Sequence, residues 1–309
     1  MKQLLCVDGG GIRGVIPAIL LARLEAATGK ACRDLFAMLA GTSTGSIITV
    51  GLLAGIRAQT LVDLYVNRGA EIFADPDLLR GAVRPKYSAA PIEGILRTML
   101  GSDWLSQTKG PELLVPATCI DPVMDGFFFK SWKARGTKLN PGDVQDDLDF
   151  QLWQIARASS AAPTYFPTAE VSSMSGKVFY MVDGGLHSNN PSLAAIASAA
   201  DLWGTEDLRV LSLGTGRRAS KLNGAASEDW GGVEWVTRGD IVSLCMDGVA
   251  GAADYQAACF KGRGIVVDRV QADLPANAVA MDDASPDNIK RLQAIAAALT
   301  LDPYWTIPV

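Results

Sequence analysis

The chain has 309 residues, of which 49% are hydrophobic and 20% charged, a composition typical of a globular protein with a substantial core. The net charge of −5 offers no positive footprint for a nucleic-acid polymer or for strong attraction to anionic lipid. The five cysteines are widely spaced without a CxxC pair and there is one histidine, so neither a disulfide framework nor a metal site is indicated.

Apolar runs alternate with helical patterns along the chain, which predicts an α/β fold with a mostly parallel central sheet flanked by helices. The predicted strands cover residues 4–7, 35–40, 113–120, 127–132, 178–182, 210–213 and 265–270. The predicted helices cover residues 15–28, 44–53, 59–73, 91–100, 150–162, 191–200, 240–260 and 287–299. Gly29 is placed to end the first helix, and Ser285 to cap the last one.

Residues 74–110 are rich in proline, glycine and charge, which predicts an irregular excursion suited to a lid or a substrate-facing loop. We find no firm domain boundary and expect a single domain over 1–309. No signal peptide is visible, and the longest apolar run, 47–56, is shorter than the roughly 20 residues that span a bilayer. We therefore expect a cytoplasmic protein whose contact with a membrane is peripheral.

A candidate nucleophile lies between a predicted strand and a predicted helix, in the sequence Gly41-Thr42-Ser43-Thr44-Gly45. This sequence fits GxSxG, in which a sharp turn exposes the serine oxygen and leaves no room for side chains at the glycines. The turn also directs a helix N-terminus toward the serine, which favours developing negative charge. The alternative without chemistry is a plain glycine-rich turn.

A second glycine-rich loop follows the first predicted strand. Its sequence is Asp8-Gly9-Gly10-Gly11-Ile12-Arg13-Gly14. It matches GxGxxG, but a dinucleotide site needs an acidic residue at the end of the second strand. Asp34 precedes the predicted strand 35–40, and the residue that follows this strand is Gly41, which is not acidic. The other interpretation is an oxyanion hole of glycine N–H groups, with Arg13 near a phosphate or left as a solvated surface residue.

Two side chains are candidates for the base that a serine hydroxyl needs. His187 follows Asp183 in the order serine, acid, histidine, but an acid that orients a histidine usually comes from a separate loop rather than from four residues away. Asp183 ends the predicted strand 178–182, so it would lie at a strand's carboxyl end, where α/β sites are built. A carboxylate is a weak base unless its surroundings raise its pKa above about 3.9. Asp183 as a plain turn residue is the alternative without chemistry.

Taken in order, three motifs resemble those of the patatin-like phospholipase family: the loop at 8–14, the GxSxG sequence at 41–45, and Asp183-Gly184-Gly185. Shorter echoes lie at 156–166, 189–191 and 212–216. The likeness covers residues 4–216 strongly and is looser over 217–309. One departure is Ser46, where many bacterial relatives carry another glycine.

The resemblance implies a three-layer patatin-like fold and a lipid acyl hydrolase of the phospholipase A or lysophospholipase type, with a Ser-Asp dyad and no catalytic histidine. We expect no cofactor. The resemblance also implies that Ser43 attacks an ester carbonyl, that Asp183 takes the proton, and that an acyl-enzyme is then hydrolysed. By the same likeness, Gly10 and Gly11 supply oxyanion donors and Arg13 helps to hold the phosphate of a membrane phospholipid.

Several alternatives stay open at this stage. Some short bacterial members of the family resemble anti-phage effectors that a cyclic nucleotide switches on. A dinucleotide-binding protein and a binding module without turnover are further alternatives, and the oligomeric state is open. Four residues are suggested as walls of the acyl pocket, although each could equally be an ordinary core residue: Leu52, Phe73, Phe127 and Phe166.

Overall fold

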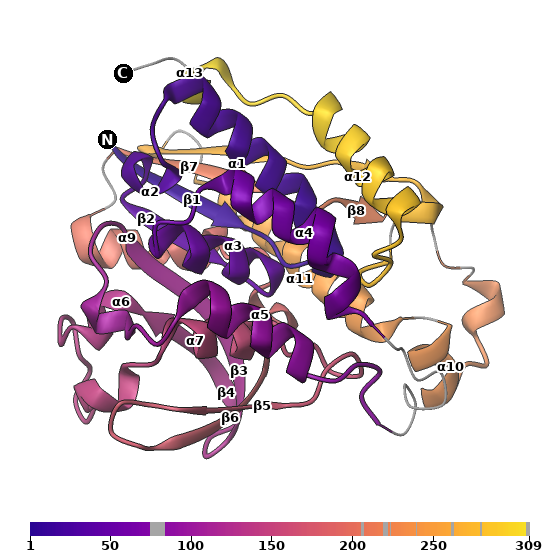
Figure 1. Ribbon diagram of the computed structural model, residues 1–309, viewed down its shortest axis with the longest axis horizontal. Helices are drawn as coiled ribbons and strands as arrows, with labels where there is room; N and C mark the ends of the chain where they lie inside the picture. The colour runs from indigo at the N-terminus through magenta and orange to yellow at the C-terminus, as the bar shows by residue number, and fades with distance from the viewer. Residues whose placement is uncertain are drawn as a thin grey trace.

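A mixed eight-stranded sheet runs through the middle of the computed structural model (Figure 1). The structure describes residues 1–74, 84–204, 207–218, 222, 224–238, 240–260, 263–278 and 280–306. The strands of the sheet are β1 (Lys2–Val7), β2 (Met38–Gly41), β3 (Glu112–Asp121), β4 (Asp125–Lys130), β5 (Ala169–Ser172), β6 (Val178–Asp183), β7 (Leu208–Leu213) and β9 (Ile265–Val270). Two short strands, β8 (Arg217–Arg218) and β10 (Asp273–Leu274), pair separately.

The sheet is parallel over most of its width. Its order is β5-β6-β3-β2-β1-β7-β9, with β4 also paired to β3. β1, β2, β3, β7 and β9 are parallel, whereas β4 and β6 run antiparallel to β3, and β5 runs antiparallel to β6. β3 is the longest strand, and its second half pairs with β6 beyond the end of β2. This overhang matters below because it brings a second strand to the site.

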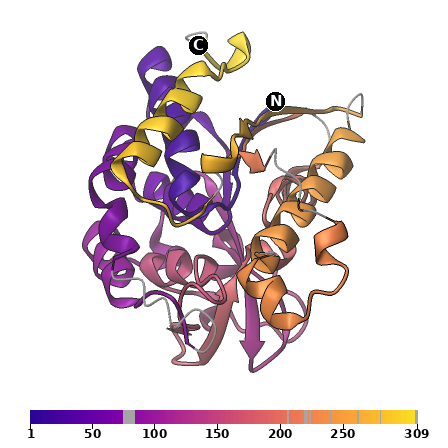
Figure 2. The ribbon, with the colours of Figure 1, turned by 90° about the vertical axis from the view of Figure 1, so that its right-hand side faces the viewer.

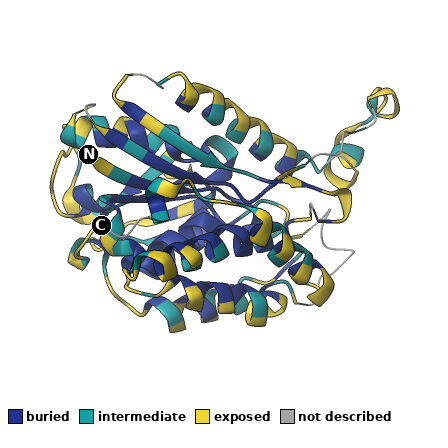
Figure 3. Ribbon diagram, turned by 90° about the horizontal axis from the view of Figure 1, so that it is seen from above, coloured by how far each residue is buried: buried dark blue, intermediate teal, exposed yellow. Residues whose placement is uncertain are grey.

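Alternate residues of the strands pack into two separate cores, as the two-residue period of a strand requires. Leu5 and Leu39 belong to the core under α1 (Val15–Thr28), α3 (Thr44–Leu53), α4 (Ala58–Ile72), α5 (Ala90–Leu100), α7 (Leu152–Ser159) and α12 (Pro286–Ala298). Leu4 and Met38 belong to the core under α9 (Ser192–Trp203) and α11 (Ile241–Ala258). Figure 2 shows the sheet between these two layers, and Figure 3 shows exposed residues along the outer sides of the helices. The predicted fold class, a mostly parallel sheet flanked by helices in three layers, is confirmed.

Two predicted helix ends are confirmed by their caps. Gly29 has φ 70° and ends α1, because this left-handed conformation is open to glycine without a Cβ penalty. At the start of α12, the Ser285 hydroxyl accepts a hydrogen bond from the Asn288 N–H at 3.3 Å.

Several predicted boundaries are wrong, two of them because a short helix interrupts an apolar run. The predicted strand 35–40 begins only at Met38, since α2 (Cys32–Leu35) precedes it. The predicted strand 127–132 ends at Lys130, where α6 (Ser131–Ala134) begins, and the predicted helix 150–162 is α7, Leu152–Ser159. Three further short helices were not predicted: α8 (Gly185–Ser188), α10 (Gly232–Thr237) and α13 (Pro303–Thr306).

Part of the predicted excursion at 74–110 forms α5, and residues 75–83 lie outside the described residues. The suggested lid therefore stays a prediction. Over the part of the chain that the structure describes, no helix is both long and apolar enough to cross a bilayer. Each of the five cysteines is free, and Cys6, Cys32 and Cys119 are buried.

Candidate active site

Ser43 occupies a strained turn between β2 and α3. Its backbone has φ 54° and ψ −122°, a conformation that a non-glycine residue rarely adopts. A Cβ at Gly41 would lie 2.2 Å from the Gly45 carbonyl oxygen, and one at Gly45 would lie 2.2 Å from the Val7 carbonyl oxygen. The two glycines of GxSxG are therefore required by close backbone packing, and the turn presents the serine side chain at the start of a helix.

Neighbouring serines hold the turn in place. The Ser43 N–H donates to the Ser159 hydroxyl at 2.9 Å, and the Ser159 hydroxyl donates to the Pro116 carbonyl at 2.7 Å. The Ser46 hydroxyl donates to the Ser43 carbonyl at 2.6 Å. Ser46, the departure noted in the sequence, thus satisfies a polar group of the turn itself.

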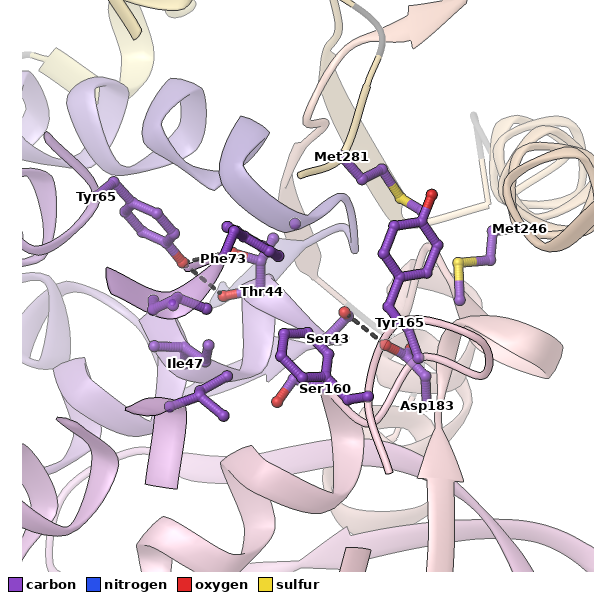
Figure 4. Close-up of a pocket in the computed structure, with 15 residues that line it drawn as sticks. Ser43, Thr44, Ile47, Tyr65, Phe73, Ser160, Tyr165, Asp183, Met246 and Met281 are labelled. Carbon is purple, nitrogen blue, oxygen red and sulfur yellow. Dashed lines mark hydrogen bonds between the residues drawn. The ribbon is translucent and has the colours of Figure 1, made fainter. Parts of the chain in front are cut away.

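Asp183 is brought to Ser43 by a strand that runs opposite to β2, the strand that leads to the serine. It is the last residue of β6, which runs antiparallel to β3 and places Asp183 opposite Ala117. The Ser43 hydroxyl donates to Asp183 Oδ2 at 2.7 Å, and the Gly185 N–H donates to Asp183 Oδ1 at 2.7 Å (Figure 4). Both oxygens of the carboxylate therefore have a partner, and one of them faces the serine.

Burial makes Asp183 a stronger base than an ordinary aspartate. The side chain is fully buried, and desolvation raises its pKa from 3.8 to about 7, although the hydrogen bonds from Ser43 and Gly185 act in the opposite direction. A carboxylate that titrates near neutral pH can accept and return a proton under physiological conditions. The structure therefore provides the buried surroundings that a carboxylate base requires, which could not be read from the sequence.

The glycine loop lies against the serine. A Cβ at Gly9 would come within 3.2 Å of Ser43 Cβ, and Gly11 lines the same cavity as Ser43. The Gly9 N–H donates to the Asn189 carbonyl at 3.0 Å, whereas the N–H groups of Gly10 and Gly11 have no protein acceptor among the described residues. Two adjacent backbone donors are therefore left for a ligand.

Close packing explains two further glycines of the loop. Gly11 has φ 59°, and a Cβ there would lie 2.1 Å from the Met281 carbonyl oxygen. A Cβ at Gly14 would lie 2.3 Å from Thr44 Oγ1. The hydroxyl of Thr44 also shares a short hydrogen bond of 2.5 Å with the hydroxyl of Tyr65 (Figure 4). The loop therefore packs against the first residue of α3 without space for side chains.

Arg13 is buried, so its interpretation as a solvated surface residue is wrong. Its Nε donates to the Gly10 carbonyl at 3.2 Å, and burial lowers the pKa of its guanidinium. The side chain thus braces the loop that carries the two free N–H groups. Its role in holding a phosphate stays a prediction.

An apolar cavity opens above Ser43 and Asp183. Figure 4 shows Phe73 and Ile47 on one side of the serine and Tyr165, Met246 and Met281 on the other. The remaining lining residues include Ile72, Ile92, Ala162 and Phe166. This lining suits an acyl chain better than a polar group.

Of the four residues suggested as walls of an acyl pocket, two line the cavity beside Ser43. Phe73 and Phe166 line the cavity, with ring centroids 5.9 Å apart. Leu52 is buried in the core and Phe127 packs against Phe150, so neither lines the cavity. Met246 and Met281 were missed because they come from the part of the chain where the family likeness is loose.

His187 is placed away from the serine. Its Nδ1 lies 3.2 Å from the Thr118 hydroxyl and its ring packs edge-on against Phe128. Burial lowers the pKa of the imidazole, which favours its neutral form. Among the described residues, Asp183 and not His187 is the hydrogen-bond partner of the Ser43 hydroxyl.

Sequence reasoning gave no role to Ser159. Its hydroxyl fixes the Ser43 N–H, and its carbonyl accepts from the Gly184 N–H at 3.3 Å. A pair of serines among alanines at the end of a buried helix is the signal that could have pointed to it.

A three-layer α/β fold in which a strained serine meets a buried carboxylate under an apolar cavity is typical of an ester hydrolase. The profile of the patatin-like phospholipase family matches residues 5–196. Patatin-like protein 2 of Arabidopsis thaliana is 29% identical over 350 residues, covering 98% of this chain and 84% of the relative. The chain belongs to the patatin-like phospholipase family.

Two further proteins resemble this chain over part of their length. The 85/88 kDa calcium-independent phospholipase A2 of Mus musculus is 31% identical over 231 residues, covering 72% of this chain and 26% of that protein. The crystal structure of VipD from Legionella pneumophila covers 99% of this chain and 69% of its own, at 10% identity and a TM-score of 0.43. Family membership supports lipid acyl hydrolase activity, with lipid esters as substrates.

Proposed function

We propose that the protein hydrolyses carboxylic esters of membrane phospholipids or lysophospholipids, with Ser43 as nucleophile and Asp183 as base. The observation that carries this proposal is the 2.7 Å hydrogen bond from the Ser43 hydroxyl to a fully buried carboxylate. The apolar cavity above the pair supports an acyl chain as the group that is bound.

In the first half-reaction, ionised Asp183 accepts the proton of Ser43 while the serine oxygen attacks the ester carbonyl. The N–H groups of Gly10 and Gly11 stabilise the oxyanion, and each such donor typically contributes about 3 kcal/mol to the transition state. Collapse of the tetrahedral intermediate breaks the ester bond, and the departing alcohol takes the proton from Asp183. An acyl-enzyme on Ser43 remains.

In the second half-reaction, Asp183 takes a proton from a water molecule that attacks the acyl-enzyme. The proton returns to the Ser43 oxygen as the fatty acid leaves. Because the reactive form of Asp183 is the ionised one, kcat/KM should rise with pH and level off above about 7. A profile that falls between pH 6 and pH 8 would contradict this assignment of the base.

The test is release of fatty acid from phosphatidylcholine vesicles and from a soluble p-nitrophenyl ester, measured on the purified protein. Ser43→Ala and Asp183→Asn should each abolish release, and Ser43→Ala should also abolish labelling by a fluorophosphonate. Ser160→Ala is the matched control, because Ser160 lines the same cavity but its hydroxyl donates to the Ala156 carbonyl at 2.8 Å.

His187→Ala separates a dyad from a triad. Activity within about threefold of the unchanged protein is expected, since His187 does not contact the serine. Loss of activity in this variant, with the fold intact, would replace the dyad by a triad.

Peripheral contact with the inner face of the membrane, a cytoplasmic location and activation by a cyclic nucleotide stay predictions. The last is tested by adding cyclic di- and trinucleotides to the vesicle assay and comparing initial rates. The single-domain organisation over 1–309 is likewise proposed, and its test is one cooperative unfolding transition seen by two probes.

A further inference from the structure

A buried ion pair holds the start of the glycine loop. Asp8, directly before Gly9, is 2% exposed. Arg269 of β9 donates to both its carboxylate oxygens, from Nη1 to Oδ1 at 2.9 Å and from Nη2 to Oδ2 at 2.5 Å. β7 lies between β1 and β9, so the arginine reaches across a whole strand. A bidentate pair of this kind fixes the orientation of the carboxylate as well as its position.

The arginine is itself held from several directions. Its Nη1 also donates to the Ser212 hydroxyl at 3.0 Å, and its Nε lies 3.0 Å from Asp254 Oδ1. The same oxygen of Asp254, in α11, accepts a hydrogen bond from Asn190 Nδ2 at 2.6 Å. The guanidinium of β9 therefore contacts β7 and helix α11, and Asp254 links it to the loop after α8.

The backbone next to Asp8 is anchored in the same region. The Asp8 N–H donates to the Leu213 carbonyl at 3.0 Å, and the Thr215 hydroxyl donates to the Gly9 carbonyl at 2.5 Å. The chain is thus fixed through Gly9, and the next two residues are Gly10 and Gly11, whose N–H groups are left for a ligand.

We infer that Arg269 is a positioning residue for the oxyanion hole: through Asp8 it sets where the N–H groups of Gly10 and Gly11 point. This inference rests on the proposed function, since it concerns donors that act on an ester. It also means that residues beyond the family match at 5–196 take part in building the site.

The Asp8–Arg269 ion pair is better explained by positioning of the glycine loop than by a contribution to the stability of the fold. A buried ion pair is weak evidence for net stabilisation, because desolvation of the two charges offsets their attraction. Misplacement of a reacting or stabilising group by about 1 Å, in contrast, can reduce a rate roughly 100-fold. Desolvation raises the pKa of Asp8 to about 6, and Arg269 opposes this rise, so the carboxylate is ionised at pH 8.

The test compares Arg269→Ala with Arg209→Ala at pH 8. Arg209 is a matched control: it lies in β7, pairs with Asp268 of β9 at 2.7 Å, and is 16% exposed against 18% for Arg269. We expect Arg269→Ala to lower kcat on a soluble ester by roughly 10- to 100-fold with KM changed by less than about threefold. Arg209→Ala should keep kcat.

Two further measurements distinguish positioning from damage. A cavity of about 80 Å³ borders Asp8, Asp254 and Arg269, so millimolar guanidinium should restore part of the lost kcat where the same concentration of urea does not. Hydrogen exchange of the peptide covering residues 8–14 should be faster in Arg269→Ala and unchanged in Arg209→Ala. If Arg269→Ala does not fold, Asp8→Asn should show the same direction of change, about tenfold in kcat.

The outcomes separate this inference from the proposed function. The inference is overturned if hydrogen exchange over residues 8–14 is unchanged in Arg269→Ala. It is also overturned if Arg269→Ala and Arg209→Ala lose the same amount of kcat. If the unchanged protein hydrolyses no ester while exchange responds as expected, the proposed function fails and the anchoring of the loop by Arg269 stands.

Discussion

Replacing Asp183 by asparagine should stabilise the protein while removing its activity. Asparagine has nearly the same shape but carries no charge, so the variant avoids placing an anion in a fully buried site. The gap between the ordinary pKa of 3.8 and the folded value of about 7 corresponds to about 4 kcal/mol, at 1.36 kcal/mol for each pKa unit.

The sign of the pH dependence follows from proton linkage. The folded protein holds a proton on Asp183 more tightly than the unfolded chain does, so its stability falls as pH rises from 3.8 toward 7 and is level above that. The variant lacks this loss. Its advantage should therefore grow by about 2 kcal/mol between pH 5.5 and pH 8, where pH 5.5 also avoids the isoelectric point near 5.0.

Urea unfolding followed by tryptophan fluorescence at pH 5.5 and pH 8 measures this difference. Other groups that titrate in the interval, Asp8 among them, are shared by the two proteins and cancel in the comparison. Ser43→Ala is the control, because it is also inactive but keeps the buried carboxylate and its pH dependence. An Asp183→Asn advantage that is the same at both pH values would refute the raised pKa and with it the case for Asp183 as base.

Three further predictions concern packing around the site. Gly45→Ala should lower the free energy of unfolding by about 3 kcal/mol or more, because its Cβ would lie 2.2 Å from a backbone oxygen. Gly94→Ala, at an exposed position of α5 with open space around the new Cβ, should instead raise it by roughly 0.5–1 kcal/mol. Urea unfolding of both variants tests this contrast. Ser159→Ala should reduce kcat about tenfold or more by leaving the buried Ser43 N–H without its acceptor, and an unchanged kcat would dismiss Ser159 as a support of the turn. Phe166→Leu should widen the cavity and raise kcat/KM for long acyl esters relative to short ones, which a chain-length series of p-nitrophenyl esters measures.

The sequence pointed to Ser43 and Asp183 but did not explain how the two side chains meet. Asp183 was expected at the carboxyl end of a strand, and it is there, but β6 runs antiparallel to β3. The pair forms because β3 extends past β2 and carries β6 back toward the serine turn. A local sequence pattern does not indicate the direction of a strand relative to its neighbours. The motif therefore identified Asp183, but only the topology of the sheet explains why this residue lies beside Ser43.

Contacts over long sequence separations were beyond the sequence analysis. The strand 265–270 was predicted with its observed bounds, yet the contact of Arg269 with Asp8 spans 261 residues and leaves no periodicity to detect. The same holds for Met246 and Met281, which reach the cavity from the loosely related part of the chain. Glycine spacing, in contrast, is a local signal, which is why the turn at 41–45 and the loop at 8–14 were found.

The strand order has a consequence for dividing this protein. A fragment limited to the family match at 5–196 would lack β7 and β9, and β1 would become the outer strand of the sheet. Of β1, the fragment would keep Leu5 to Val7, which pair with β7 in the structure and are fully buried. Such a fragment would present an apolar row of unpaired N–H and C=O groups, the template on which chains add to one another and aggregate. A fragment that keeps β7 beside β1, and β9 beside β7, must therefore extend at least to Val270, far past the residues that the family profile matches.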